Sequence, residues 1–207
     1  MKILSHRGYW ESSTEKNSPI AIGRSFQLGY GTETDVRDLG GKLVVSHDMP
    51  TGGELGWDEM LVLLEGKSLP IAVNVKSDGL ADAVAQAMNR RLVSDWFAFD
   101  MSVPDMRHWI KRGLPVFTRA SEVERTPAYY AQAQGVWLDA FDSVWYDVGL
   151  IEGFLLEGKR VCIVSEELHG REPRAQWEMM RSAKWASNNN VMICTDKPLD
   201  AKAFFTQ

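Results

Sequence analysis

Three short segments near the start of the chain carry side chains that could act together in acid–base and phosphate chemistry. They are His6-Arg7-Gly8, Glu33-Thr34-Asp35 and His47-Asp48, and each stands at the end of a short run able to form a β-strand. Histidine exchanges protons near neutral pH, and arginine holds phosphate through paired hydrogen bonds. We therefore expect an active site in which His6 and His47 transfer protons and Arg7 binds a phosphate.

The second segment predicts a metal site. Side chains alternate along a strand, so Glu33 and Asp35 point to one face, with Cα atoms roughly 6 to 7 Å apart at about 3.3 Å of rise per residue. Two unpaired anions at one site repel each other and raise a pKa. A hard divalent cation with oxygen ligands would remove that conflict. The alternative is a pair of solvated carboxylates on an exposed edge strand.

The order of these segments is similar to that of the glycerophosphodiester phosphodiesterase family, which belongs to a wider group of metal-dependent phosphodiesterase barrels. A later run, Ile71-Ala72-Val73-Asn74-Val75-Lys76, is similar to the family's Glu-x-Lys strand, with Lys76 matching and Asn74 standing where the family has glutamate. The closing Thr195-Asp196-Lys197-Pro198 is similar to the family's last strand. These motifs cover the first third of the chain and its end.

The resemblance implies metal-dependent hydrolysis of a small-molecule phosphodiester. A glycerophosphodiester, which would give glycerol 3-phosphate and an alcohol, is one substrate of that kind. The implied cation is Ca²⁺ or Mg²⁺, held by Glu33, Asp35 and, more weakly, Asn74. Arg7 and Lys76 would bind the phosphate, and His6 and His47 would be the catalytic acid and base in either order.

Two further readings stay open. Asn74 brings no negative charge, so either the cation binds more weakly or another acid completes the site, with Asp139 and Glu122 as candidates. The same residues would also suit a barrel that binds a phosphorylated ligand without converting it, or a lyase or isomerase acting on a phosphorylated metabolite.

The elements that must position these residues alternate along the whole chain. Apolar runs predict strands over 2–5, 31–39, 42–46, 69–76, 96–101, 115–119, 136–140, 160–165 and 191–195, and helices fall between the main strands, including 127–133. Eight strand–helix alternations without a long linker predict a (β/α)₈ TIM barrel forming one domain over residues 1–207. A doubly wound open sheet is the alternative, since order along the chain does not prove closure.

Composition limits the partners. The 207 residues are 44% hydrophobic with a net charge of −5, which argues against nucleic acid or an anionic membrane surface as a partner. No leader or membrane-spanning run precedes His6, so we expect a cytoplasmic protein with Cys162 and Cys194 as buried thiols. His108 and His169 are read as surface residues, and Trp10 as a candidate lining residue of the site.

Overall fold

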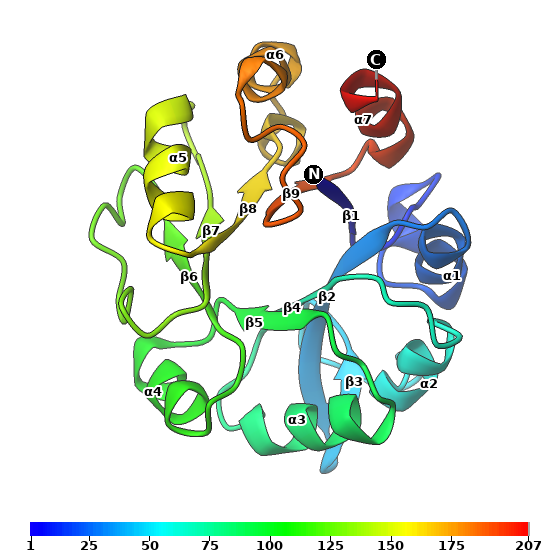
Figure 1. The fold of residues 1–207 in the computed structure, drawn as a ribbon. Coiled ribbons are helices and arrows are strands. Elements are labelled where there is room, and N and C mark those ends of the chain that lie inside the picture. Colours follow the sequence, from blue (N-terminus) through cyan, green and yellow to red (C-terminus); the bar gives the residue numbers. More distant parts are fainter. Residues whose placement is uncertain (207) are drawn as a thin grey trace.

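The computed structural model describes residues 1–206 and forms a ring of parallel strands surrounded by helices (Figure 1). The parallel strands are β1 Lys2–His6, β2 Gly31–Leu39, β4 Ile71–Val75, β5 Trp96–Phe99, β6 Phe117–Ala120, β7 Gly135–Leu138, β8 Arg160–Val164 and β9 Val191–Thr195, and β3 Lys42–Val45 pairs antiparallel with β2. The helices are α1 Pro19–Gln27, α2 Trp57–Val62, α3 Ala81–Arg90, α4 Val103–Lys111, α5 Val148–Leu156, α6 Arg174–Ser182 and α7 Pro198–Phe205, with short 3₁₀ turns η1 Ser13–Glu15 and η2 Glu166–His169.

The strand order decides between the two predicted architectures. The parallel strands follow one another as β5-β4-β2-β1-β9-β8-β7-β6, with β3 alone off this path. The two ends of the order meet at a bridge between Ala98 and Val116, where the Ala98 N–H donates to the Pro115 carbonyl at 2.9 Å. The predicted (β/α)₈ barrel is confirmed as a nearly closed ring, and the doubly wound open sheet is wrong.

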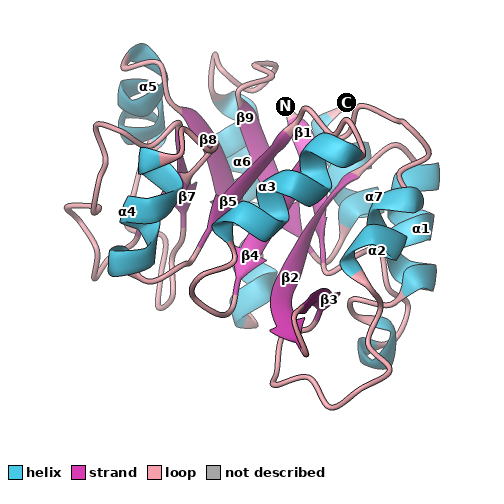
Figure 2. Cartoon of the chain, turned by 90° about the horizontal axis from the view of Figure 1, so that it is seen from below, coloured by secondary structure: helices cyan, strands magenta, loops and turns pink. Residues whose placement is uncertain are grey.

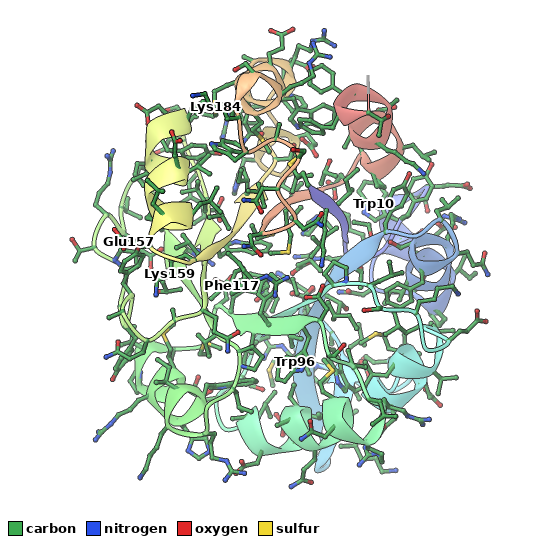
Figure 3. All side chains as sticks on the ribbon, viewed as in Figure 1. Trp10, Trp96, Phe117, Glu157, Lys159 and Lys184 are labelled. Atoms are coloured by element: carbon green, nitrogen blue, oxygen red, sulfur yellow. The ribbon has the colours of Figure 1, made fainter. Side chains whose placement is uncertain are left out.

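Side chains alternate across each strand and fill the ring with aromatic and small residues. On β5, Trp96 packs outward among helix residues, whereas Phe97 and Phe99 point inward; Figure 3 shows Trp96 between β5 and α3, and Phe117 near the centre of the ring. Inside, Phe97 stacks on Phe117 with ring centres 3.7 Å apart, and Phe99 stacks on Trp137 at 3.8 Å. This aromatic layer forms the floor beneath the barrel mouth.

Both cysteines lie inside the barrel as free thiols. Cys162 of β8 and Cys194 of β9 are fully buried among the interior residues. Burial raises the pKa of each thiol well above its usual value. The predicted burial of both thiols is confirmed.

Two apolar layers separate the strands from the helices. One packs α1 to α4 against β2 to β5, and the other packs α5 to α7 against β6 to β9. Figure 2, at right angles to Figure 1, shows α3 lying across the outside of the strands. Within residues 1–206, none of the helices has the length and apolar character needed to cross a membrane.

The N-terminal end of the barrel is closed by an ion cluster. Asp95 accepts from Lys2 Nζ at 2.6 Å and from Arg160 at 2.8 Å, which joins β5 to β1 and β8 across the ring. Burial raises the pKa of Asp95, but the hydrogen bond from Lys2 and the charge of Arg160 outweigh it and hold this pKa below its usual value.

The helix predicted over residues 127–133 is wrong. The segment forms turns at 128–132, and the ammonium of Lys159 donates to the carbonyls of Tyr130 at 2.8 Å, Ala131 at 3.2 Å and Ala133 at 2.7 Å. These carbonyls are therefore satisfied by a buried cation instead of by amides one helical turn further on.

Gly135 tests the packing of the interior. A Cβ at this position, the first residue of β7, would lie 2.5 Å from the Phe117 ring and 2.6 Å from the Arg160 carbonyl oxygen. We expect Gly135→Ala to lower the free energy of unfolding by about 1–3 kcal/mol in urea titrations, because the core cannot take the extra methyl without moving the stacked rings.

The matched control is Gly153→Ala in α5, where a Cβ meets no atom within 4 Å. This substitution should instead stabilise the protein by about 0.5–1 kcal/mol, because alanine favours a helix. Equal effects of the two substitutions would contradict the packing described here.

Candidate active site

Strand β2 carries two buried carboxylates into the barrel interior. Glu33 is 1% exposed and Asp35 is fully buried. In the sheet register Glu33 lies beside His6 of β1, and Asp35 lies beside Asn74 of β4. Because β2 lies between β1 and β4, these acids are not on an edge strand, and the alternative of two solvated carboxylates is wrong.

Cations and an amide surround Asp35. Arg7 Nε lies 3.0 Å from Asp35 Oδ2, Lys76 Nζ lies 3.4 Å from Oδ1, and the Asn17 amide donates to Oδ2 at 2.8 Å. Asp35 therefore fixes the two cations predicted to bind phosphate at the C-terminal end of the strands, where active sites of this fold lie.

The turn after β1 has a backbone that few sequences allow. Arg7 and Asn17 both adopt left-handed conformations, with φ of 58° and 60°. Gly8 has φ of 85°, and a Cβ there would lie 2.7 Å from the backbone of Ala21 in α1. Strained residues of this kind concentrate at functional sites, and here the strain aims Arg7 at Asp35.

His6 is held in one orientation by an acid from the other end of the chain. Its Nδ1 lies 2.7 Å from Asp196 Oδ1, just after β9, and its Nε2 lies 3.9 Å from Glu33 Oε2. A carboxylate only accepts, so Nδ1 carries the proton and Nε2 is left to face Glu33. Sequence analysis did not assign Asp196 to the site; its position directly after the strand beside β1 is the signal that could have found it.

His47 is held more loosely than His6. Its side chain is 45% exposed, and its Nδ1 lies 2.8 Å from Asp48, whose own side chain is 92% exposed. The preceding Ser46 N–H donates to the Asp35 carbonyl at 3.1 Å, which ties the end of β3 to the site.

These residues surround one cavity of about 310 Å³ at the barrel mouth. The predicted site residues that line it are His6, Arg7, Glu33, His47, Asn74 and Lys76, and the rest of its lining is Phe99, Asp100, Trp137, Asp139, Phe141, Val164, Leu168 and His169. Asp35 is buried beside the cavity, in contact with Arg7 and Lys76. The structure therefore brings together the predicted catalytic, phosphate-binding and metal-binding residues, whereas the candidates Glu122 and Trp10 do not line this cavity.

The prediction that His169 is a surface residue is wrong. Its side chain lines the cavity, and its Nε2 lies 2.7 Å from Oδ1 of the buried Asp139. Residues 166–172 are mostly polar, which hid this placement. His108 is exposed on α4, as predicted.

The remaining candidates take other roles. Asp139 is engaged by His169 and by the Ala140 N–H at 2.9 Å, and the Glu122 carboxylate accepts from the Asp142 N–H at 2.6 Å. Within residues 1–206, Glu122 Oε2 is buried without a hydrogen-bond partner, but Glu122 does not line the cavity, and Asp139 Oδ1 already has two partners. Trp10 donates its indole N–H to the His6 carbonyl at 3.1 Å and so supports the turn after β1.

The residues present fit a hard cation. In the described part of the chain, Glu33 Oε2, Asp35 Oδ1 and Asn74 Oδ1 are buried oxygens without a hydrogen-bond partner, although Asp35 Oδ1 has the Lys76 ammonium at 3.4 Å. Unsatisfied buried acceptors are costly, and oxygen is the ligand that Ca²⁺ and Mg²⁺ prefer. Residues 1–206 contain no group of three or more His, Cys, Asp or Glu residues that could hold a metal ion, so a cation here would have two carboxylates and one amide as its protein donors.

Glu33 is the more weakly compensated acid of the pair. Burial raises its pKa most and the charge of Asp35 raises it further, to about 7, against the opposing charges of His6 and Arg7. The Asn74 amide donates to Glu33 Oε1 at 3.1 Å and also favours the ionised form. A bound cation would replace the proton that Glu33 otherwise keeps.

The raised pKa gives a stability test. The pKa of Glu33 in the folded protein, about 7, is above its usual 4.5, so the folded state binds the proton more tightly and loses stability as pH rises through this window. In a chelating buffer we expect Glu33→Gln to be more stable than the unmodified chain at about pH 8, by on the order of 3 kcal/mol. The difference should vanish near pH 4.

Urea unfolding at the two pH values measures this difference. Glu152→Gln on the exposed surface of α5 is the control, and it should change stability by less than about 0.5 kcal/mol at either pH. If Glu33→Gln raised the free energy of unfolding equally at both pH values, burial would not be what keeps the Glu33 carboxyl group protonated.

No family model matches the sequence, and no curated protein matches it either. The fold, by contrast, is similar over the whole chain to solved structures.

Three similar structures carry related names. A glycerophosphodiester phosphodiesterase from Agrobacterium tumefaciens has a TM-score of 0.72 at 18% identity, with 100% of both chains covered. An Oleispira antarctica phosphodiesterase in complex with its product sn-glycerol-3-phosphate has a TM-score of 0.70 at 12% identity, covering 100% of this chain and 97% of that one. A glycerophosphoryl diester phosphodiesterase from Parabacteroides distasonis has a TM-score of 0.66 at 13% identity, covering 99% and 86%.

A barrel of another activity is less similar. Phosphoribosyl anthranilate isomerase from Thermus thermophilus has a TM-score of 0.51 at 13% identity, covering 100% of this chain and 97% of that one. The chain thus shares the fold of the phosphodiesterase structures, and its chemistry must be argued from its own residues.

Proposed function

We propose that this chain is a metal-dependent phosphodiesterase that hydrolyses a small-molecule phosphodiester. The observation that carries the proposal is the convergence of six side chains on one cavity, with Asp35 buried directly beside it; the six are His6, Arg7, Glu33, His47, Asn74 and Lys76. Two imidazoles, two cations and a pair of acids at the C-terminal end of barrel strands are the groups that diester hydrolysis uses.

The two cations would bind the phosphate. Arg7 and Lys76 are both paired with Asp35, at 3.0 Å and 3.4 Å, and both line the cavity. Held in place before the substrate arrives, they would stabilise the negative charge that develops on the phosphate oxygens in the transition state.

The two imidazoles would move the protons. One of His6 and His47 takes a proton from the attacking oxygen, and the other gives a proton to the departing alkoxide. The attacking oxygen belongs either to water or to a neighbouring substrate hydroxyl, in which case a cyclic phosphate forms and water then opens it. Asp196 orients the His6 ring at 2.7 Å, which leaves Nε2 turned toward Glu33. Asp196 is a positioning residue in this scheme.

Glu33, Asp35 and Asn74 would hold the cation, for which Ca²⁺ and Mg²⁺ are the proposed occupants. The bound cation would supply Lewis-acid polarisation of a non-bridging phosphate oxygen. Glu33 must lose its proton for this to happen, since its pKa without a cation is about 7.

A glycerophosphodiester is the proposed substrate class. The fold shared with three phosphodiesterase structures supports it, one of which was solved with the product sn-glycerol-3-phosphate. The buried free thiols Cys162 and Cys194 suit a reducing compartment, and we propose the cytoplasm.

The imidazoles provide the first test. We expect His6→Ala and His47→Ala each to lower turnover of a hydrolysed diester by roughly 10² to 10⁴, the usual contribution of a general acid or base. Steady-state kinetics on glycerophosphocholine with Mg²⁺ present measure this loss. His108→Ala on the exposed surface of α4 is the control and should keep full activity. Near-normal turnover in both site variants would rule out this mechanism.

Asn74 tests the cation site. Activity should disappear in a strong chelator and return with Ca²⁺ or Mg²⁺. Asn74→Asp adds a third carboxylate, so we expect it to tighten cation binding about tenfold or more, whereas Asn74→Ala removes a donor and should weaken it. The rise in Tm with added cation measures both changes without an activity assay. Unchanged cation affinity in Asn74→Asp would place the cation elsewhere.

A second candidate function is ligand binding without turnover. The hydrogen bond from Asn74 to Glu33 at 3.1 Å favours it, because that bond partly satisfies the acids without a cation. Phosphorus NMR of the diester with metal present separates the two: a new monoester signal supports hydrolysis, and a shifted, undiminished diester signal supports binding alone.

A further inference from the structure

The side of the cavity opposite the proposed catalytic residues is a wall built by the ends of β5, β7 and β8. We call this surface the far wall; its residues are Asp100, Trp137, Asp139, Phe141 and His169. The proposed chemistry uses none of them. They nevertheless face the same 310 Å³ space, which a bound diester would share with them.

The centre of the far wall is the pair His169–Asp139. Its two side chains come from separate loops, Asp139 after β7 and His169 at the end of η2. Asp139 Oδ1 lies 2.7 Å from His169 Nε2 and also accepts from the Ala140 N–H at 2.9 Å. The Asp139 side chain is 6% exposed and the His169 side chain 24%. The acid is thus buried beneath an imidazole that reaches the cavity.

A half-buried arginine joins the two loops. Arg171 donates to the Phe141 carbonyl at 2.6 Å and to Glu166 Oε1 at 2.9 Å, so it joins the loop after β7 to the turn that carries His169. The Phe141 ring meets the His169 ring edge-on, with centres 5.4 Å apart. His169 is therefore held as firmly as His6, which also lies 2.7 Å from its carboxylate.

The pairing leaves one imidazole nitrogen for a ligand. Because the Asp139 carboxylate accepts from Nε2–H, Nδ1 of His169 is left to accept a hydrogen bond when the ring is neutral or to donate one when it is protonated. A hydroxyl group can both donate and accept, so it suits this nitrogen in either state.

The described residues of the far wall offer no unpaired carboxylate to a cationic ligand. Asp139 is paired with His169, and Asp100 accepts from Arg119 Nε at 3.0 Å in a two-point ion pair. Arg119 also lies 5.3 Å from the centre of the Phe141 ring. Asp100, Asp139 and the Phe141 ring already have cationic or hydrogen-bonding partners. An ammonium group would therefore have to compete with these partners for the two carboxylates and the ring.

The phosphate position directs one ester arm toward the far wall. Arg7 and His47 line the barrel cavity and also a neighbouring outer groove of about 470 Å³, whose wall includes Lys16, Asn17 and Glu54. A phosphate bound at Arg7 therefore stands between the two spaces. A diester has two ester arms. One arm would extend into the barrel cavity and the other into the outer groove.

We propose that the far wall binds one ester arm of the substrate, that this arm is neutral and bears hydroxyl groups, and that His169 bonds to a hydroxyl. The proposal rests on the proposed phosphodiesterase function. It makes His169 a specificity-determining residue and Asp139 the positioning residue that orients it.

Three diesters that share p-nitrophenol as leaving group test the proposal: glyceryl, ethyl and choline p-nitrophenyl phosphate. The unmodified chain should prefer the glyceryl arm, and His169→Phe should lower the kcat/KM ratio of glyceryl to ethyl substrate about tenfold or more, since a hydrogen-bonding site discriminates by the bond it loses. His169→Gln, which keeps a donor and an acceptor, should restore part of the ratio. His108→Phe is the control with the same substitution.

The outcomes are distinct. An unchanged ratio in His169→Phe, or a preference for the choline arm in the unmodified chain, overturns the far-wall proposal while leaving hydrolysis in place. If no diester is hydrolysed, the proposed function fails, and calorimetry with glycerol 3-phosphate and inorganic phosphate tests the far wall alone. Binding of glycerol 3-phosphate that His169→Phe weakens about tenfold relative to inorganic phosphate supports the subsite; equal weakening of both ligands overturns it.

Discussion

Two carboxylates two residues apart on one interior strand are the constraint around which the barrel mouth is arranged. Strand β2 is neither exposed nor at an edge, so Glu33 and Asp35 cannot be solvated. Buried charge must be paired or neutralised. The left-handed turn at Arg7, the conformation of Asn17 and the inward position of Lys76 all serve to compensate Asp35.

The buried negative charge of Asp35 is compensated more fully than that of Glu33, and this difference is what suits Glu33 to the proposed cation site. Asp35 has two cations and an amide against it, whereas Glu33 has one amide hydrogen bond and an imidazole at 3.9 Å. The fixed positive charge of Arg7 and Lys76 is therefore placed beside Asp35 and not beside Glu33. At Glu33 a proton and an external cation would compete for the same carboxylate, so binding of the proposed cation would depend on pH.

Much of this arrangement could be predicted from the sequence, because two periodicities fix it. The two-residue repeat of a strand puts Glu33 and Asp35 on one face, and the alternation of apolar runs with helices predicts the barrel and the shared rim. Contacts between distant loops could not be predicted in the same way. Asp196 meets His6 across nearly the whole chain, and Asp139 meets His169 between two loops, so both pairs depend on strand neighbours that only the closed ring defines.

The turns at 128–132 show a second limit of the sequence. Pro127 and the residues after it suit a helix locally, but Lys159, thirty residues away, supplies a buried ammonium that takes up their carbonyls. A local pattern predicts an element only where no distant partner offers its backbone a better hydrogen bond.

The seam between β5 and β6 has a consequence for how the molecule could change over evolutionary time. The two outer apolar layers divide at this seam, and the ring is held there by the bridge between Ala98 and Val116. The groups proposed for bond cleavage come from the first half-barrel, apart from the Asp196 support, whereas most of the far wall comes from the second. Substitutions that change substrate selectivity could therefore accumulate in the second half-barrel while the residues proposed for bond cleavage stay the same. Selectivity and reactivity could then evolve separately within one chain.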